Sequence, residues 1–356
     1  MKTVLNLTDI DPRTQPLFFG ESLGLARYDR LKYPIFNQLA IQQEKSFWQT
    51  SEIDLSKDSL DRKMLSEDEK AIFDSNLRWQ TATDAFLSRG IDELKQSCSN
   101  PELERCLNVW SFFELNIHSV AYSDILKNVY PDETVFWDSI LSDQEIVKRM
   151  SEIKNAFDQL FDPEDSNIRK RIIGALVNVQ IIEGIGFYNS FAFSFCFPAL
   201  AGKMVGNGKI LKLIEKDEAF HCSITSNLLS ILKQNPEEGF SDFIVEADII
   251  EAFKVATEHE IDWIDYLFDH GNRALLGITP NQFKGWVKFR ANSRLKTLGI
   301  QPIYPVVKQN PLGQWYNEFV GNKEVQPAPQ EQELIAYQIG QVNNSTDITD
   351  LGIDLG

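Results

Sequence analysis

Two stretches of the chain decide its fold: Glu114-Leu-Asn-Ile-His118-Ser-Val-Ala-Tyr122 and Asp217-Glu218-Ala-Phe-His221. Each stretch places a glutamate and a histidine three or four positions apart, and such positions return to the same face of a helix. Two further carboxylates, Asp84 and Glu183, stand inside other apolar stretches with helical character. Two helices with a Glu/His pair and two with a carboxylate are the sequence form of a dinuclear metal site inside a helix bundle.

The surroundings of Glu183 indicate why a metal fits this pattern. This residue lies between Val177-Asn-Val-Gln-Ile-Ile and Gly184-Ile-Gly-Phe-Tyr, where an unpaired carboxylate would be costly to bury. Coordination of a metal removes that cost. Mixed carboxylate and imidazole ligands suit iron or manganese better than thiolate-seeking metals. One Glu/His pair alone is commonly a surface ion pair, but the order Asp, Glu/His, Glu, Glu/His along the chain predicts a metal site.

Length, charge and cysteine usage limit the class of protein. The chain has 356 residues, of which 43% are hydrophobic, which is enough for one large core. Its formal net charge of −17 and the lack of a basic stripe argue against nucleic-acid binding. Residues 1–6 contain no long apolar segment, so we expect no signal peptide and a cytoplasmic location. The four cysteines form no CxxC pair, which is ordinary for a reducing compartment.

Helix signals dominate the chain, and no sustained alternation of apolar and polar residues predicts a sheet. Capping boxes begin at Ser66 and Ser142, and proline follows an N-cap residue at Asn100 and Thr279. Residues 184–202 approach the length of a membrane span, but their polar residues and proline favour a buried bundle helix. The expected helices are 66–90, 100–130, 142 onward, 167–197, 207–233, 242–270 and 279–299.

The composition changes near residue 325. Residues 1–324 are interpreted as one domain that holds the metal site. Residues 325–356 are rich in Gln, Pro, Ala, Asn and Asp and lack the apolar content to pack by themselves. We therefore expect a flexible C-terminal tail that becomes ordered only when it meets a partner protein.

With these residues the chain resembles the radical-generating small (beta) subunit of class I ribonucleotide reductase. The resemblance runs from Pro16-Leu-Phe-Phe-Gly20 to the tail. It implies an all-α, ferritin-like helix bundle with a dinuclear metal site in its core, assembled as a homodimer. Its most specific motifs are Ser46-Phe-Trp48, Glu183-Gly-Ile-Gly-Phe-Tyr-Asn-Ser-Phe191, residues 206–221, and Ala328-Pro-Gln-Glu331 followed by Tyr337.

The resemblance also implies which residues bind metal. Glu114 and Glu218 would bridge the two ions. Two irons are the first expectation, and two manganeses or a mixed pair are the alternatives. The first metal would be bound by Asp84, Glu114 and His118, and the second by Glu183, Glu218 and His221.

Five more residues match positions that the family uses to form and relay the radical, and three match positions that protect it. Tyr122 resembles the tyrosine that carries the radical. Asp217 resembles the carboxylate that joins a metal-bound histidine to the redox-active Trp48, a supporting contact that such histidines commonly have. Tyr337 resembles the tail tyrosine that passes the oxidising equivalent to the large subunit, and Glu331 matches a tail carboxylate that assists this step. Phe187, Phe191 and Ile214 resemble the apolar shell that protects the radical.

One departure from the family pattern concerns the first Glu/His pair. The family normally has Glu-x-x-His, whereas this chain has Glu114-x-x-x-His118. Counting from Trp110 makes Glu114 the ligand, and counting back from His118 makes Leu115 the ligand. A one-residue insertion can be absorbed as a π-bulge, so we expect Glu114 to coordinate. The alternative is an altered site with one carboxylate fewer.

The implied activity is that of an enzyme subunit. Together with the large subunit, which the tail would bind, it would serve the reduction of ribonucleotides to deoxyribonucleotides. We expect no nucleic-acid or membrane partner. A ferritin-type iron-storage protein, a di-iron oxidase acting directly on a substrate, and a binding subunit with a degenerate site are the alternatives. The sequence leaves open the metal, the need for an activating flavoprotein, and the choice between di- and triphosphate substrates.

Overall fold

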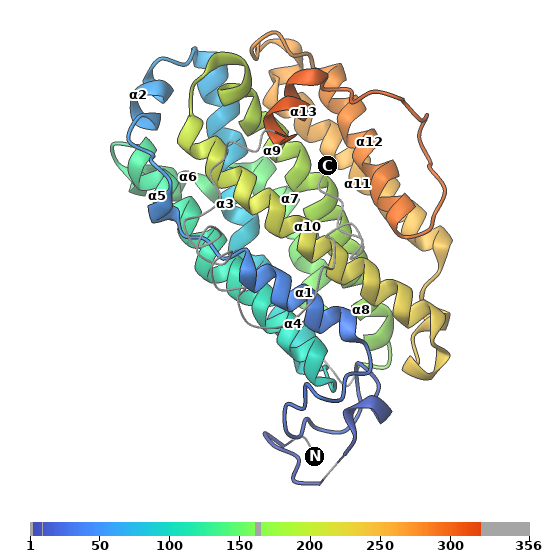
Figure 1. Cartoon of the computed structure of the whole chain (residues 1–356). Coiled ribbons are helices and arrows are strands. Elements are labelled where there is room, and N and C mark those ends of the chain that lie inside the picture. Colours follow the sequence, from blue (N-terminus) through green and yellow to red (C-terminus); the bar gives the residue numbers. More distant parts are fainter. Residues whose placement is uncertain (1–2, 9, 161–164, 322–356) are drawn as a thin grey trace.

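The computed structural model describes residues 3–8, 10–160 and 165–321. In this part of the chain the backbone is almost entirely helical, and β-pairing is limited to the isolated bridges Phe18–Cys98 and Leu275–Ile278. Figure 1 shows the long helices running side by side in an elongated bundle. The predicted all-α class is confirmed.

Four long rods form the centre of the bundle in the described residues, and each rod is either one helix or two helices in line. Helices α3 and α10 contain 30 residues each, so each is about 45 Å long. Helix α3 packs on α4, α5 and α9, and α10 packs on α8 and α9. The rods are α3 (Glu67–Gln96), α4 (Pro101–Phe112) with α5 (Ser119–Val129), α8 (Ile168–Ile181) with α9 (Phe187–Cys196), and α10 (Val205–Gln234).

The other helices surround these rods. Helix α1 packs on α4 and α10, α7 packs on α3 and α8, and α11 and α12 pair with each other. Short 3-10 turns lie at Pro12–Thr14, Thr50–Glu52, Pro236–Glu238, Ser241–Phe243 and Asp269–Gly271. The surrounding helices are α1 (Pro34–Lys45), α2 (Asp58–Lys63), α6 (Glu133–Ile140), α7 (Gln144–Asp158), α11 (Glu246–Leu267), α12 (Pro280–Thr297) and α13 (Gln314–Gly321).

Two of the rods contain wider, π-helical turns. The first π turn (Phe113–His118) joins α4 to α5, and the second π turn (Ile182–Gly186) joins α8 to α9. A further π segment, Phe197–Ala201, follows α9. A π turn holds one residue more than an α turn, and such turns are frequent at functional sites. The first two contain residues expected from the sequence to bind metal.

Helix ends agree with the capping signals in part. Ser66 forms one of the two predicted capping boxes, Asn100 caps α4, and Thr279 precedes Pro280 at the start of α12 as predicted. The predicted end near Gly90 is wrong, because α3 continues to Gln96. A Cβ on Gly90 would lie 2.4 Å from the ring of Phe157, so this glycine permits close packing. Helix α7 is capped by Asp143, whose carboxylate accepts from Glu145 N and Ile146 N, and not by Ser142.

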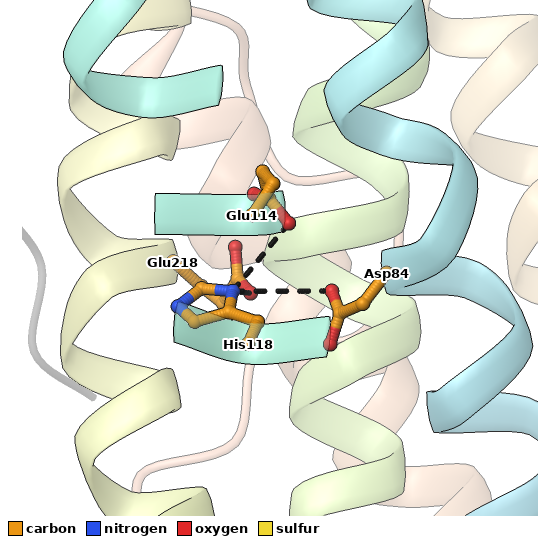
Figure 2. Close-up of side chains that lie close together, drawn as sticks. All are labelled: Asp84, Glu114, His118 and Glu218. Atoms are coloured by element: carbon orange, nitrogen blue, oxygen red, sulfur yellow. Dashed lines mark ion pairs between the residues drawn. The ribbon is translucent and has the colours of Figure 1, made fainter. Parts of the chain in front are cut away.

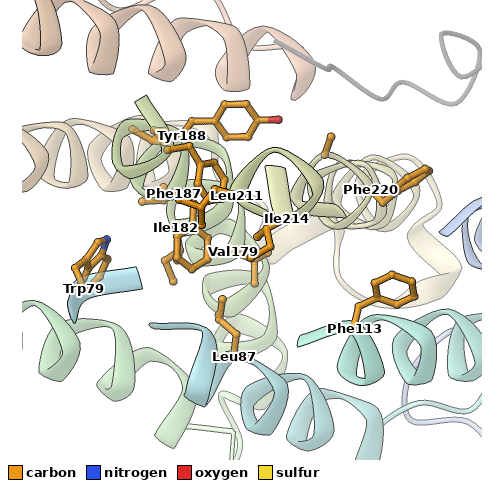
Figure 3. Packing of buried hydrophobic residues seen from close by; sticks show 14 of the residues in the cluster. Trp79, Leu87, Phe113, Val179, Ile182, Phe187, Tyr188, Leu211, Ile214 and Phe220 are labelled. Carbon is orange, nitrogen blue, oxygen red and sulfur yellow. The ribbon is translucent and has the colours of Figure 1, made fainter. Parts of the chain in front are cut away.

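The rod formed by α8 and α9 is the most apolar element of the bundle. Residues Ile168–Ala201 are long and apolar enough to cross a membrane by composition, but 89% of their most apolar window is buried inside the protein. Figure 3 shows Ile182 and Phe187 of this rod packed among Leu211 and Ile214 of α10. This segment is therefore a core helix of the bundle, as expected from its polar residues.

Helix α10 begins in the interior and is capped by side chains from α2. The carboxylate of Asp58 accepts hydrogen bonds from Gly206 N (3.1 Å) and Asn207 N (2.6 Å), and Asp61 Oδ2 accepts from Met204 N (3.0 Å). Backbone N–H groups in the first turn of a helix have no partner within the helix. Because these N–H groups are buried and cannot bond to water, Asp58 supplies the acceptors that they need. Burial also raises the pKa of the Asp58 carboxyl to about 6.

We predict that Asp58→Ala destabilises the protein by about 1–3 kcal/mol, because it leaves two buried N–H groups unpaired. Thermal unfolding followed by circular dichroism at pH 8, where Asp58 is ionised, measures this as a lower Tm. Asp54→Ala is the matched control, since this exposed carboxylate caps only the neighbouring Ser56. Equal Tm values for the two variants would contradict the capping role.

Candidate metal centre

The four rods bring the six expected ligands together at one level of the bundle. Asp84 comes from α3, Glu183 from the second π turn, and the other four from the first π turn and α10. All six side chains are fully buried, at 0% exposure. They are Asp84, Glu114, His118, Glu183, Glu218 and His221.

The six residues form two overlapping groups. In each group one donor atom per residue lies within 4.8 Å of every other, which is close enough for all of them to reach one ion. The first group adds Asp84 and His118 to Glu114 and Glu218, and Figure 2 shows these four side chains converging. The second group adds Glu183 and His221 to the same two glutamates. Glu114 and Glu218 therefore belong to both groups, as bridging ligands must.

Both histidine rings turn their Nδ1 atoms toward the carboxylates. His118 Nδ1 lies 3.4 Å from an oxygen of Glu114, 3.4 Å from Glu218 and 4.0 Å from Asp84. His221 Nδ1 lies 3.0 Å from Glu114 and 2.9 Å from Glu218. A neutral imidazole whose Nδ1 lone pair points in this direction can bind a metal.

The charges of the cluster call for cations. Among the described residues, both oxygens of Asp84 and of Glu183, Oε2 of Glu114 and Oε1 of Glu218 have no hydrogen-bond partner. Burial, followed by repulsion from Glu114, raises the pKa of Asp84, Glu183 and Glu218 well above the usual range. Two divalent cations would offset both the burial and the repulsion. The residues present therefore fit a dinuclear metal group.

The structure joins one histidine of the cluster to Trp48. Asp217 Oδ2 lies 3.2 Å from His118 Nε2, and it also accepts a hydrogen bond of 2.8 Å from Trp48 Nε1. All three side chains are buried. If Nδ1 binds a metal, His118 would carry its proton on Nε2, and Asp217 would accept it and fix the orientation of the ring.

Gln43 and Trp110 also contact the cluster. The amide nitrogen Nε2 of Gln43, on α1, lies 2.7 Å from His221 Nε2. If His221 Nδ1 binds a metal, His221 Nε2 would carry the proton, and the amide turned over would present Gln43 Oε1 as its acceptor. Trp110 Nε1 donates to Glu114 Oε1 (3.1 Å), and its ring stacks on His221 at 5.0 Å. In the sequence Trp110 serves only as a reference for locating Glu114, and no local signal marks Gln43 as a partner of His221.

Tyr122 lies on α5, one helical turn beyond His118, and is fully buried. Burial and then the carboxylate of Asp84 raise the pKa of its phenol far above the usual range, so the phenol is neutral. Phe187, Phe191 and Ile214, the expected apolar shell, are also fully buried, and the rings of Phe187 and Phe191 stack at 5.7 Å. Glu331 and Tyr337 lie outside the described residues.

The first π turn accommodates the unusual Glu-x-x-x-His spacing. It places Glu114 and His118 in the cluster, whereas Leu115 points outward with 50% of its surface exposed. Glu114, and not the position counted back from His118, therefore faces the other ligands. The extra residue widens the turn instead of displacing the carboxylate.

We predict that Glu114→Ala lowers the affinity for the metal pair by about 10–100-fold or more. Loss of a residue that only hydrogen-bonds to a metal ligand already lowers affinity by this factor, and Glu114 is expected to bind the metals directly. Leu115→Ala, the matched control at the other counted position, should bind metal as the unmodified protein does. Anaerobic titration of metal-free protein with Fe(II), with metal content measured on the separated protein, gives both affinity and stoichiometry. Unchanged binding in Glu114→Ala would exclude Glu114 as a ligand.

Comparisons with known proteins agree with this arrangement. The family described as "Ribonucleotide reductase, small chain" matches residues 26–311. The chain is 33% identical over 374 residues to the ribonucleoside-diphosphate reductase 1 subunit beta of Escherichia coli O157:H7, with 98% of each chain covered. It is similar to the solved R2 subunit of ribonucleotide reductase from Clostridium botulinum, at a TM-score of 0.80 and 25% identity over 90% of this chain and 98% of that one. The dimanganese(II)-NrdF of Streptococcus sanguinis shares the fold, at a TM-score of 0.69 and 19% identity over 83% and 98% of the chains.

Proposed function

The chain belongs to the small-chain family of ribonucleotide reductase, and from this premise we propose how its buried cluster works. The protein is the small subunit of class I ribonucleotide reductase, an enzyme component that serves the reduction of ribonucleotides by a large subunit. The Escherichia coli relative is named a ribonucleoside-diphosphate reductase subunit, which supports diphosphates as the substrates of the complete enzyme.

The observation that carries the proposal is the pair of ligand groups that share Glu114 and Glu218. Asp84 and His118 complete the site of the first metal, and Glu183 and His221 complete the second. The donor set of carboxylates and imidazoles suits iron and manganese alike. Two irons remain our first proposal. The dimanganese(II) form of the Streptococcus sanguinis protein supports manganese as the alternative, because the two chains share a fold.

The metal pair, when bound, supplies the oxygen-dependent oxidising chemistry that forms a tyrosyl radical. Tyr122 is the residue placed to lose one electron and its phenolic proton. Its neutral phenol holds that proton until oxidation, and Asp84 is the carboxylate whose charge raises the pKa of the phenol most. The sequence resemblance assigns the buried rings of Phe187 and Phe191 to the shell that keeps water and reductants away from the phenol. Tyr122 thus combines proximity to the metals with isolation from solvent.

The hydrogen-bonded series His118, Asp217 and Trp48 is the proposed route by which the oxidising equivalent leaves the core. Asp217 Oδ2 contacts both His118 Nε2 and Trp48 Nε1, so one carboxylate couples a metal ligand to an oxidisable indole. Beyond Trp48 the route would continue to Tyr337 of the tail, assisted by Glu331, and then to the large subunit. The tail residues enter the proposal through the sequence resemblance alone.

An oxidase that acts directly on a small substrate is less well supported. Such an enzyme would need a pocket beside the metals. A cavity of about 480 Å³ beside the second π turn is lined by residues that include Trp79, Arg149 and Ile182, and by none of the six cluster residues. This cavity therefore gives no support to a direct oxidase, whereas the contacts of Asp217 with His118 and Trp48 support the protein-to-protein route.

We predict that Tyr122→Phe and Tyr337→Phe both abolish ribonucleotide reduction in the presence of the large subunit. Only Tyr122→Phe should remove the tyrosyl signal from the electron paramagnetic resonance spectrum of protein loaded with Fe(II) and exposed to oxygen. Each variant is the control for the other, because one loses the radical and the other loses its transfer. A signal lost in Tyr337→Phe and kept in Tyr122→Phe would reverse these roles.

We propose that residues 1–324 form the metal-binding domain and that residues 325–356 dock on the large subunit. The last seven residues, Asp350-Leu-Gly-Ile-Asp-Leu-Gly356, alternate acidic with apolar or small side chains. A segment of this kind can become ordered in a partner's groove, with its apolar side chains as anchors. The tail would then bring Tyr337 to the large subunit.

A synthetic peptide of residues 343–356 should compete with the small subunit for the large subunit and inhibit turnover. The matched control peptide carries serine at Leu351, Ile353 and Leu355, which keeps the charge and removes the apolar anchors. Inhibition by the first peptide alone is the expected result of an assay at fixed subunit concentrations. If neither peptide competes, the docking proposal is wrong.

We further infer a homodimer and a cytoplasmic location. The homodimer follows from membership of the family. The four cysteines are free thiols, and Cys106, Cys196 and Cys222 are buried, which fits a reducing compartment.

A further inference from the structure

Besides Tyr122 on α5, a second buried tyrosine, Tyr188, lies on α9, in the rod that carries Glu183. It follows Glu183 by five residues, which corresponds to about 7.5 Å along a helix axis, and it is fully buried. Its ring packs against Phe191 at a centroid distance of 6.0 Å. Figure 3 shows Tyr188 beside Phe187 at the edge of the apolar cluster. A tyrosine at this position is a rival electron donor to Tyr122.

The guanidinium of Arg290, on α12, covers the ring of Tyr188. Its Cζ lies 3.6 Å from the ring centroid, and the side chain is 1% exposed. Arg290 Nε donates to the carbonyl oxygen of Gly184 (3.3 Å), the residue after Glu183, so the guanidinium is held in place from the second π turn. Arginine stays charged at any pH of interest. The contact stabilises the neutral, electron-rich ring, whose negative face meets the cation.

The two tyrosines have different surroundings. Tyr188 donates its hydroxyl hydrogen bond to the backbone carbonyl of Glu215 (3.4 Å), a group that accepts hydrogen bonds but does not accept a proton near neutral pH. The Glu215 carboxylate also lies near Tyr188 and accepts a hydrogen bond from Tyr316, so both tyrosines have a carboxylate in their surroundings. The geometric difference between them is the guanidinium on the ring of Tyr188, since none of the cation contacts of the described residues involves the ring of Tyr122.

We propose that Arg290 directs oxidation to Tyr122 by making Tyr188 a poor electron donor. Oxidation of a tyrosine removes one electron, which the oxygen-activated metal pair accepts, and one proton, which a base accepts. Loss of an electron from Tyr188 would create positive charge beneath a fixed guanidinium, and a buried site screens that repulsion weakly. Arg290 acts through Tyr188 and is a positioning residue. This inference rests on the proposed tyrosyl-radical function.

The test places Arg290 substitutions in a Tyr122→Phe background, in which the first donor is absent. Each protein is loaded with Fe(II), exposed to oxygen and frozen within seconds for electron paramagnetic resonance. Tyr122→Phe alone should give no tyrosyl signal. Adding Arg290→Met, which removes the charge but keeps much of the volume, should produce a tyrosyl signal, and further substitution of Tyr188→Phe should remove it. Ring-deuterated tyrosine, which narrows the signal, separates tyrosyl from tryptophanyl radicals.

Arg290→Lys is the matched control, because it keeps a cation near the ring and should stay silent. Arg290→Gln, which can still donate to Gly184, replaces the Met variant if that protein does not fold, as judged by Tm and by two metals per chain. A folded, metal-loaded Met or Gln variant without a Tyr188 signal would overturn the inference. A missing signal in the otherwise unmodified protein, with Tyr122 and Arg290 intact, would instead refute the proposed function on which it rests.

Discussion

Burial of four carboxylates at one level of a helix bundle is the constraint on which the rest of this structure depends. Asp84, Glu114, Glu183 and Glu218 are withdrawn from water and face one another, and burial and mutual repulsion raise the pKa of three of them. Such an arrangement is costly unless cations are bound. Metal affinity and bundle stability are therefore coupled. The rods that carry the cluster must also extend beyond it in both directions, so that neither end of the bundle exposes the carboxylates to water.

The two π turns show how the bundle adjusts its geometry to that site. A regular helix turns about 100° for each residue, so one inserted residue would rotate everything beyond it away from its partners. The first π turn absorbs the residue between Glu114 and His118, and the second presents Glu183. Around this frame, contacts with Asp217 and Gln43 fix the histidine rings. The ligands come from secondary structure, and their orientation comes from neighbours distant in the sequence.

The difference between local signals along one helix and contacts between distant residues explains what could be predicted from the sequence. The six cluster residues were found because a carboxylate in an apolar helix and a Glu/His pair on one face are local signals. Ser66 and Thr279 were found as caps for the same reason. Gly90, Gln43 and Arg290 were misread or missed, because each acts on a residue that only the folded bundle brings near it: Phe157 against Gly90, His221 beside Gln43 and Tyr188 under Arg290. Asp143 was missed for a local reason, because the adjacent Ser142 is an equally good N-cap residue by type.

The most direct test of the central claim is a crystal structure of the metal-loaded protein, with anomalous scattering recorded at the iron and manganese absorption edges. The account predicts two metal peaks inside the cluster, with Glu114 and Glu218 contacting both and with Asp84 and His118 on one side and Glu183 and His221 on the other. The two edges also identify each metal. A single peak, or a Glu114 side chain turned away from both metals, would contradict the account.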